Sequence, residues 1–108
     1  MAYASVNGLD IYYEIYGSGD TPLIVLPGGF MTVQAMGALV PDLAATRQVF
    51  GVELQGHGHT ADIDRPLHYE TMANDIAALM EHLSLAQADF LGYSLGGGVA
   101  LRLAIQHP

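Results

Sequence analysis

The stretch that decides the fold covers residues 88–108 and reads ADFLGYSLGGGVALRLAIQHP. It begins with an apolar run of strand length, Ala88 to Gly92, and ends with an apolar stretch typical of a helix, Val99 to Ile105. Between them stands Gly92-Tyr93-Ser94-Leu95-Gly96, which fits the pattern G-x-S-x-G. On a sharp turn from strand to helix, this pattern predicts a serine whose hydroxyl projects above the end of a sheet.

Ser94 is therefore the candidate nucleophile. Gly92 and Gly96 suit such a turn, because side chains there would collide with the neighbouring strand and helix. The N-terminus of the following helix adds a partial positive charge and free N–H groups, which suit a developing oxyanion. The alternative is a glycine-rich turn with a bystander serine. The position between an apolar strand and a helix favours the nucleophile.

A second loop supports this interpretation. Leu23 to Leu26 is a continuous apolar run, which predicts a strand buried on both faces, and Pro27-Gly28-Gly29-Phe30 follows it. The glycines of this loop can turn the Gly29 N–H, or the neighbouring Phe30 N–H, toward Ser94. The N–H of Leu95 is the second candidate donor to an oxyanion. Taken alone, the loop is equally consistent with an ordinary turn between a strand and a helix.

The remaining elements follow from local patterns. Asn7-Gly8 predicts a tight hairpin between strands at residues 3–6 and 11–16. Further predictions are a helix over 35–45 that restarts at Pro41, a strand over 49–54, and a helix that Thr71 caps. That last helix has an apolar stripe of core residues, which consists of Met72, Ile76, Leu79, Met80 and Leu83.

The alternation of strand and helix from Leu23 onward predicts an α/β fold. We expect one domain built on a mostly parallel sheet with helices on both faces. The chain has 108 residues, of which 51% are hydrophobic and 13% charged, so it has ample material for a core. No repeat or linker divides it.

Composition excludes several classes of function. Three basic residues stand against eleven acidic ones, for a net charge of −8, so we expect no nucleic-acid partner. The absence of cysteine rules out thiolate metal sites and a cysteine nucleophile. No secretory signal opens the chain, which predicts a cytoplasmic protein. Thr21 to Pro41 lacks charge, but Pro27-Gly28-Gly29 breaks it, so we expect no membrane span.

Three motifs now stand in a familiar order: Pro27 to Phe30, Glu53-Leu54-Gln55-Gly56-His57-Gly58-His59-Thr60, and Gly92 to Gly98. In order and spacing, the chain from Tyr3 to Pro108 resembles the N-terminal half of the α/β-hydrolase superfamily. Two positions depart from the common pattern: Pro27 replaces a frequent histidine, and Glu53 a frequent aspartate. The serine at the turn Gly92 to Gly96, the nucleophile elbow of this superfamily, is unlike the haloalkane dehalogenase and epoxide hydrolase branches, which carry aspartate there.

The resemblance implies a serine hydrolase that cleaves an ester or related acyl bond of a small molecule. Ser94 would be the nucleophile, with Gly29 and Leu95 as oxyanion donors through their N–H groups. The residues expected to line an apolar acyl pocket are Phe30, Met31 and Tyr93, the last of which is equally a candidate packing residue. No cofactor is implied, and no metal ligand set is identified.

The base and acid of the triad are missing from these residues. In this superfamily they follow the serine, but only His107 does so, roughly 20 Å along the helix, and no acidic residue does. His57 and His59 resemble members of a structural loop. We therefore expect residues 1–108 to be the N-terminal part of a single α/β-hydrolase domain. Its C-terminal strands and triad partners would lie beyond residue 108, and the isolated chain would be inactive or very weak.

Three other interpretations stay open. The chain is also consistent with a non-catalytic half-domain that acts as an assembly or binding module. A cofactor-free perhydrolase or haloperoxidase would use the same serine site. A dinucleotide-binding fold is poorly served, because residues 92–98 lack the G-x-G-x-x-G order. If the strand over 88–92 is an open edge, we expect it to drive self-association.

Overall fold

The computed structural model describes residues 2–108, and its centre is one sheet of five strands in the order β1-β2-β4-β3-β5. The strands are β1 (Ala2–Val6), β2 (Leu9–Tyr16), β3 (Leu23–Leu26), β4 (Val49–Val52) and β5 (Asp89–Gly92). The helices are the short 3-10 helix η1 (Gln34–Met36), α1 (Leu39–Ala44), α2 (Tyr69–His82) and α3 (Leu95–Gln106).

The sheet is mixed. β3 pairs in parallel with β4 on one side and β5 on the other, whereas β2 pairs antiparallel with both β1 and β4. Among these strands only β2 runs against the rest. The predicted α/β class, with a mostly parallel sheet, is confirmed.

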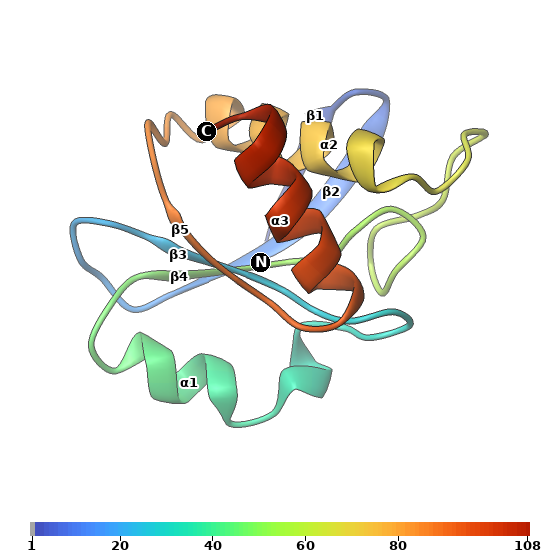
Figure 1. Cartoon of the computed structure of the whole chain (residues 1–108). Helices are drawn as coiled ribbons and strands as arrows, with labels where there is room; N and C mark the ends of the chain where they lie inside the picture. The colour runs from blue at the N-terminus through green and yellow to red at the C-terminus, as the bar shows by residue number, and fades with distance from the viewer. Residues whose placement is uncertain (1) are drawn as a thin grey trace.

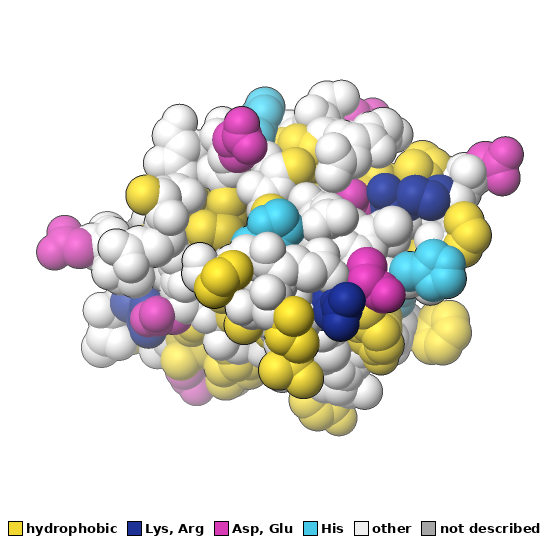
Figure 2. Space-filling model, turned by 45° about the horizontal axis from the view of Figure 1, so that its top comes forward, with side chains coloured by type: hydrophobic (Ala, Val, Ile, Leu, Met, Phe, Trp, Pro, Cys, Tyr) yellow, Lys and Arg dark blue, Asp and Glu magenta, His cyan; other side chains and the backbone are white. Residues whose placement is uncertain are grey.

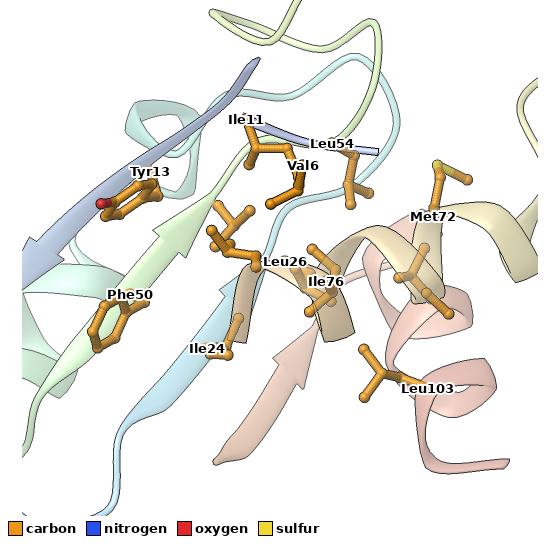
Figure 3. Packing of buried hydrophobic residues seen from close by; sticks show 14 of the residues in the cluster. Val6, Ile11, Tyr13, Ile24, Leu26, Phe50, Leu54, Met72, Ile76 and Leu103 are labelled. Carbon is orange, nitrogen blue, oxygen red and sulfur yellow. The ribbon is translucent and has the colours of Figure 1, made fainter. Parts of the chain in front are cut away.

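Helices cover both faces of the sheet, with α1 on one side and α2 and α3 on the other (Figure 1). The alternation of side chains along β3 explains how both faces are filled. Leu23 and Val25 pack with Val40 of α1 in one core cluster. Ile24 and Leu26 point to the opposite face, where Ile76 of α2 and Leu103 of α3 meet them (Figure 3). All four residues of β3 are buried, as expected for a strand between two helical layers.

The N-terminal hairpin also forms as predicted. Asn7 and Gly8 both have positive φ, at 52° and 83°, which is the backbone of a two-residue hairpin turn between β1 and β2. This hairpin places β1 at one edge of the sheet.

Two local predictions were wrong. The helix over 35–45 is broken into η1 and α1, because the backbone reverses at Gly37, where φ is 64°. The predicted cap Thr71 lies inside α2, which begins earlier at Tyr69 and has His68 in the capping position. The Thr71 hydroxyl instead donates to the His68 carbonyl at 3.0 Å.

β5 is the last strand in the order, and three of its four residues are only half-buried. Within residues 2–108, its outer edge has no strand beside it, and self-association through that edge stays a prediction. No helix in the described part of the chain has the length and apolar character needed to cross a bilayer. The uncharged stretch from Thr21 to Pro41 instead forms β3, a loop, η1 and the start of α1.

Candidate active site

Ser94 occupies the turn between the end of β5 and the start of α3, as the sequence pattern predicts. Its backbone has φ 53° and ψ −110°, a conformation that L residues rarely adopt. Such strain persists only where the surrounding structure enforces it, and it concentrates at functional sites. Ser94 is exposed, and its side chain makes no capping hydrogen bond to α3. Its hydroxyl is therefore free to meet a ligand.

The glycines on either side of Ser94 allow this tight turn. A Cβ at Gly96 would overlap the backbone carbonyl of Leu26 at the end of β3, and one at Gly92 would overlap the carbonyl of Gly96. Close packing of α3 against β3 and β5 thus requires both glycines. The predicted collision with a neighbouring strand and helix is what the structure shows.

The loop after β3 lies beside this turn. The Tyr93 N–H donates to the Leu26 carbonyl at 3.1 Å, and a Cβ at Gly29 would lie 4.0 Å from the Leu95 Cβ. Neither the Gly29 N–H nor the Leu95 N–H donates to a backbone acceptor within residues 2–108. For Leu95 this follows from its place at the start of α3, where N–H groups have no partner within the helix. Two unpaired donors therefore stand near each other beside Ser94.

A cavity of about 420 Å³ opens at this point. Its walls come from three loops and the start of two helices, and its lining consists of Gly29, Phe30, His57, Leu67, Tyr69, Ser94 and Leu95. Four residues that the sequence analysis singled out thus share one hollow, namely Ser94, Gly29, Leu95 and Phe30. Phe30 stands fully exposed at its rim, with a positive φ of 61°.

The other two predicted substrate contacts lie around Gly28 instead of in the lining. A Cβ on Gly28 would meet the Tyr93 ring at 2.9 Å and the Met31 sulfur at 3.1 Å. Tyr93 is largely exposed, and Met31 is half-buried. Both residues neighbour the cavity from the side of the Gly28 backbone.

Sequence reasoning assigned no binding role to three of the lining residues: Leu67, Tyr69 and His57, the last of which it placed in a structural loop. Leu67 and Tyr69 are large apolar side chains in an otherwise polar segment that leads into α2, and both are exposed. Two large apolar residues in a polar stretch just before a helix are the sequence signal that could have indicated a binding wall. His57 is buried, and its Nδ1 lies 2.9 Å from the Gln55 carbonyl oxygen.

The buried carboxylate of Glu53 connects the two loops that flank the site. It accepts hydrogen bonds from the Val33 N–H at 2.9 Å, the His59 N–H at 2.6 Å and the His59 Nδ1 at 2.9 Å. Gly58 leaves room for this carboxylate, because a Cβ there would overlap it. Glu53 therefore ties the segment that follows Phe30 to the loop that contains His57.

A second network holds the same loop from behind. Arg65 donates to Gln55 and forms an ion pair with buried Asp75, with the Nη2 and Oδ2 atoms 2.6 Å apart. The hydrogen bonds that Arg65 donates to the Asp75 carboxylate raise the pKa of Arg65 above its usual value.

The basic side chains of the molecule do not form a patch on the face drawn in Figure 2. They lie apart from one another there, each beside an acidic side chain.

A third polar cluster lies on β2, where the Glu14 carboxylate accepts hydrogen bonds from the Tyr12 and Tyr16 hydroxyls. The Tyr12 ring stacks on His59 with centroids 4.1 Å apart, so this cluster continues the support of the Glu53 loop. The hydrogen bond to Glu14, as the main cause, and burial, as the second, raise the pKa of Tyr16 to about 12. The same two causes raise the pKa of Tyr12 above that of Tyr16.

His107 does not reach the site. It follows α3 at the end opposite Ser94, and its Nε2 lies 2.8 Å from the Asn74 Oδ1. Of the five histidines of the chain, His57 alone lines the cavity.

Known proteins share the sequence pattern and the fold of this chain. The chain is 33% identical over 93 residues to the dihydrolipoyllysine-residue acetyltransferase component of an acetoin cleaving system from Pseudomonas putida, covering 86% of this chain and 25% of that protein. It is 49% identical over 70 residues to a pimeloyl-[acyl-carrier protein] methyl ester esterase from Neisseria meningitidis, covering 65% of this chain and 25% of the esterase.

Among solved structures, the enol-lactonase from Burkholderia xenovorans LB400 superposes with a TM-score of 0.87 at 34% identity, covering 97% of this chain and 42% of the lactonase. The chain thus spans between a quarter and about two fifths of the length of these proteins. Residues 21–108 match the model of the alpha/beta hydrolase fold family, and the chain belongs to that family.

Proposed function

We propose that this chain carries the nucleophile and the oxyanion donors of a serine hydrolase that cleaves esters or related acyl bonds. The observation that carries the proposal is the strained, exposed Ser94 in one cavity with the unpaired N–H groups of Gly29 and Leu95. Two relatives point to the same bond class, because a methyl ester esterase and an enol-lactonase both act on an acyl carbon bonded to oxygen.

In the proposed reaction, the Ser94 Oγ attacks the acyl carbon of the substrate and forms a tetrahedral intermediate. The Gly29 and Leu95 N–H groups, with the N-terminal end of α3, stabilise the negative charge on its oxygen. The bond to the leaving oxygen then breaks, and the Oγ proton reaches that oxygen through a general base. Water attacks the resulting acyl-enzyme in the same way and releases the acid, which restores the Ser94 hydroxyl.

The base is part of the proposal as well. Histidine with an orienting carboxylate is the usual partner of such a serine, and His107 is directed to Asn74 at the other end of α3. Because the relatives are more than twice as long as this chain, we propose that a further segment supplies the histidine and the acid. Residues 1–108 alone would then react slowly and without efficient turnover.

The direct test is intact mass after incubation with a fluorophosphonate probe, in the 108-residue form and in any longer form that the source encodes. We expect a single adduct that Ser94→Ala abolishes. Ser84→Ala is the matched control, because Ser84 also has a positive φ (58°) but lies after α2, away from the cavity, so the adduct should persist. An adduct that survives Ser94→Ala, or no adduct on any form, contradicts the proposal.

A further inference from the structure

We propose that His57 determines substrate specificity: its Nε2 accepts a hydrogen bond from a hydroxyl or amide N–H on the acyl part of the substrate. This inference rests on the proposed serine hydrolase function. It adds a substrate class, namely esters or lactones whose acyl chain carries a hydrogen-bond donor.

The protonation of His57 follows from its one hydrogen bond. Its Nδ1 lies 2.9 Å from the Gln55 carbonyl oxygen, which can only accept, so the hydrogen of the neutral ring resides on Nδ1. The other ring nitrogen, Nε2, then carries a lone pair and acts as an acceptor. Gly56 and Gly58, both at positive φ, shape the turn that carries His57, and the contact with the Gln55 carbonyl holds the ring.

His57 lines the cavity, and its Nε2 is the ring nitrogen left for a ligand, because Nδ1 is taken by the Gln55 carbonyl. The His57 Nε2 has no hydrogen-bond partner within residues 2–108. Among these residues, the Arg47 Nε is the one side-chain nitrogen or oxygen that is both enclosed and unpaired, so the unpaired Nε2 of His57 is not fully enclosed. His57 as a whole residue is 8% exposed. That small exposed area borders the cavity that also contains Ser94.

The surroundings make this acceptor selective. The wall beside His57 is mainly apolar and consists of Phe30, Leu67, Leu95 and the ring of Tyr69, with the Phe30 and His57 rings 6.2 Å apart. An acyl chain that fills this hollow displaces water from Nε2. A chain with a donor replaces that hydrogen bond, whereas a plain hydrocarbon chain leaves the acceptor unpaired.

Two matched substrates test the inference: p-nitrophenyl butanoate and p-nitrophenyl 3-hydroxybutanoate. In both, the Ser94 Oγ takes the acyl group, p-nitrophenolate leaves with the electron pair of the broken bond, and the Oγ proton passes to solvent or to the base. The rate of p-nitrophenolate release and the mass of the Ser94 adduct report acylation. We expect the hydroxy ester to react about fivefold faster, the effect of one hydrogen bond of about 1 kcal/mol.

Two variants separate recognition from support of the loop. His57→Asn keeps a donor near the Nδ1 position for the Gln55 carbonyl but has no atom at Nε2, so the preference should fall to about one. His57→Gln can place an amide oxygen near the Nε2 position and should keep part of the preference. His82→Asn, at the exposed end of α2, is the control that should keep all of it.

The outcomes distinguish the two proposals. A labelled Ser94 with no preference between the esters, or a preference that survives in His57→Asn, overturns the role of His57 and leaves the hydrolase proposal intact. A chain whose Ser94 does not react with the fluorophosphonate overturns both. Nitrogen-15 NMR of the histidine rings gives an independent readout, because a hydrogen on Nε2 of His57 would also overturn the inference.

Discussion

Two neighbouring regions of the molecule differ in whether their polar groups are paired. The first is the loop from Glu53 to Arg65, and the second consists of the two loops that meet at Ser94. In the first, buried polar side chains are paired: Glu53 accepts three hydrogen bonds, and Gln55 bonds both Asp62 and Arg65. In the second, two N–H groups lack acceptors, and Ser94 and Phe30 hold a positive φ. Unpaired groups and strain are concentrated around the cavity that contains Ser94, and the hydrogen-bonded loop beside them, here called the paired loop, supplies the rigidity that maintains them.

The largest effect should come from filling the space at the turn. Gly96→Ala places a methyl group into the Leu26 and Pro27 carbonyls, which are backbone and cannot rotate away. We expect a loss of about 4 kcal/mol or more in the free energy of unfolding, together with loss of Ser94 labelling. Urea denaturation followed by circular dichroism measures the first effect.

The matched control is one residue further along α3. A Cβ at Gly97 would come no closer than 3.3 Å to the Gly92 carbonyl oxygen, and alanine favours the helix, so Gly97→Ala should change stability by about 1 kcal/mol or less. Equal losses at both positions would show that the close approach of α3 to β3 is not what makes Gly96 necessary.

Breaking the paired loop should have the next largest effect. Glu53→Gln replaces a carboxylate that accepts three hydrogen bonds with an amide whose NH2 faces donors. We expect a loss of about 2 to 4 kcal/mol and slower fluorophosphonate labelling, since the Val33 link to the Gly29 loop weakens. Glu81→Gln, on the exposed side of α2, should change stability by no more than about 0.5 kcal/mol. If a folded Glu53→Gln variant is labelled at the normal rate, the paired loop does not support the geometry around Ser94.

The tyrosines beside the paired loop predict a loss of stability in alkali. Because the pKa of Tyr16 is raised from 10.0 to about 12 in the folded chain, the unfolded chain releases its proton first. The stabilisation is complete below pH 10 and is lost as the pH rises through about 12. Urea denaturation at a series of pH values should show this decline, and Tyr16→Phe should make it shallower. Tyr3→Phe, an exposed ring, should leave the slope unchanged, and an equal change there would refute the assignment.

The smallest effect should come from the surface ion pair at the other end of the sheet. Arg47 Nη2 and Asp89 Oδ2 are 2.8 Å apart, but Asp89 is largely exposed, so Asp89→Asn should cost about 1 kcal/mol or less and the cost should fall with added salt. Asp75→Asn, which leaves Arg65 half-paired inside the paired loop, should cost more. Equal losses of stability in Asp89→Asn and Asp75→Asn would show that burial does not strengthen the Arg65–Asp75 pair relative to the exposed Arg47–Asp89 pair.

Most of the fold could be predicted from local patterns. The apolar run over 23–26, the Asn7-Gly8 turn and the stripe in α2 have a single favourable structure each. The break at Gly37 and the early start of α2 were not predictable in this way. Both depend on how the chain returns to the sheet. Glycine at position 37 is a common helix C-cap, but the sequence alone also allows a glycine within a helix, and His68 caps α2 without a side-chain bond.

The site was predictable where one residue type is required by geometry. The pattern of Gly92, Ser94 and Gly96 is recognisable in the sequence, because a turn that packs this closely against a strand, with φ near 53° at Ser94, leaves room for few other residues. The path that brings His57, Leu67 and Tyr69 to the serine is not visible in their local sequence. They come from a long irregular segment whose path is set by Glu53 and Arg65, and only the folded chain shows that this path ends at the serine.

The exposed ring of Phe30 has an optical consequence, because the sequence contains no tryptophan. Phe30→Trp would give residues 1–108 a single indole, placed at the rim of the hollow that holds Ser94. Its emission would come from one place alone, so a shift in colour or brightness would report the arrival of any molecule there, whether or not a bond is broken.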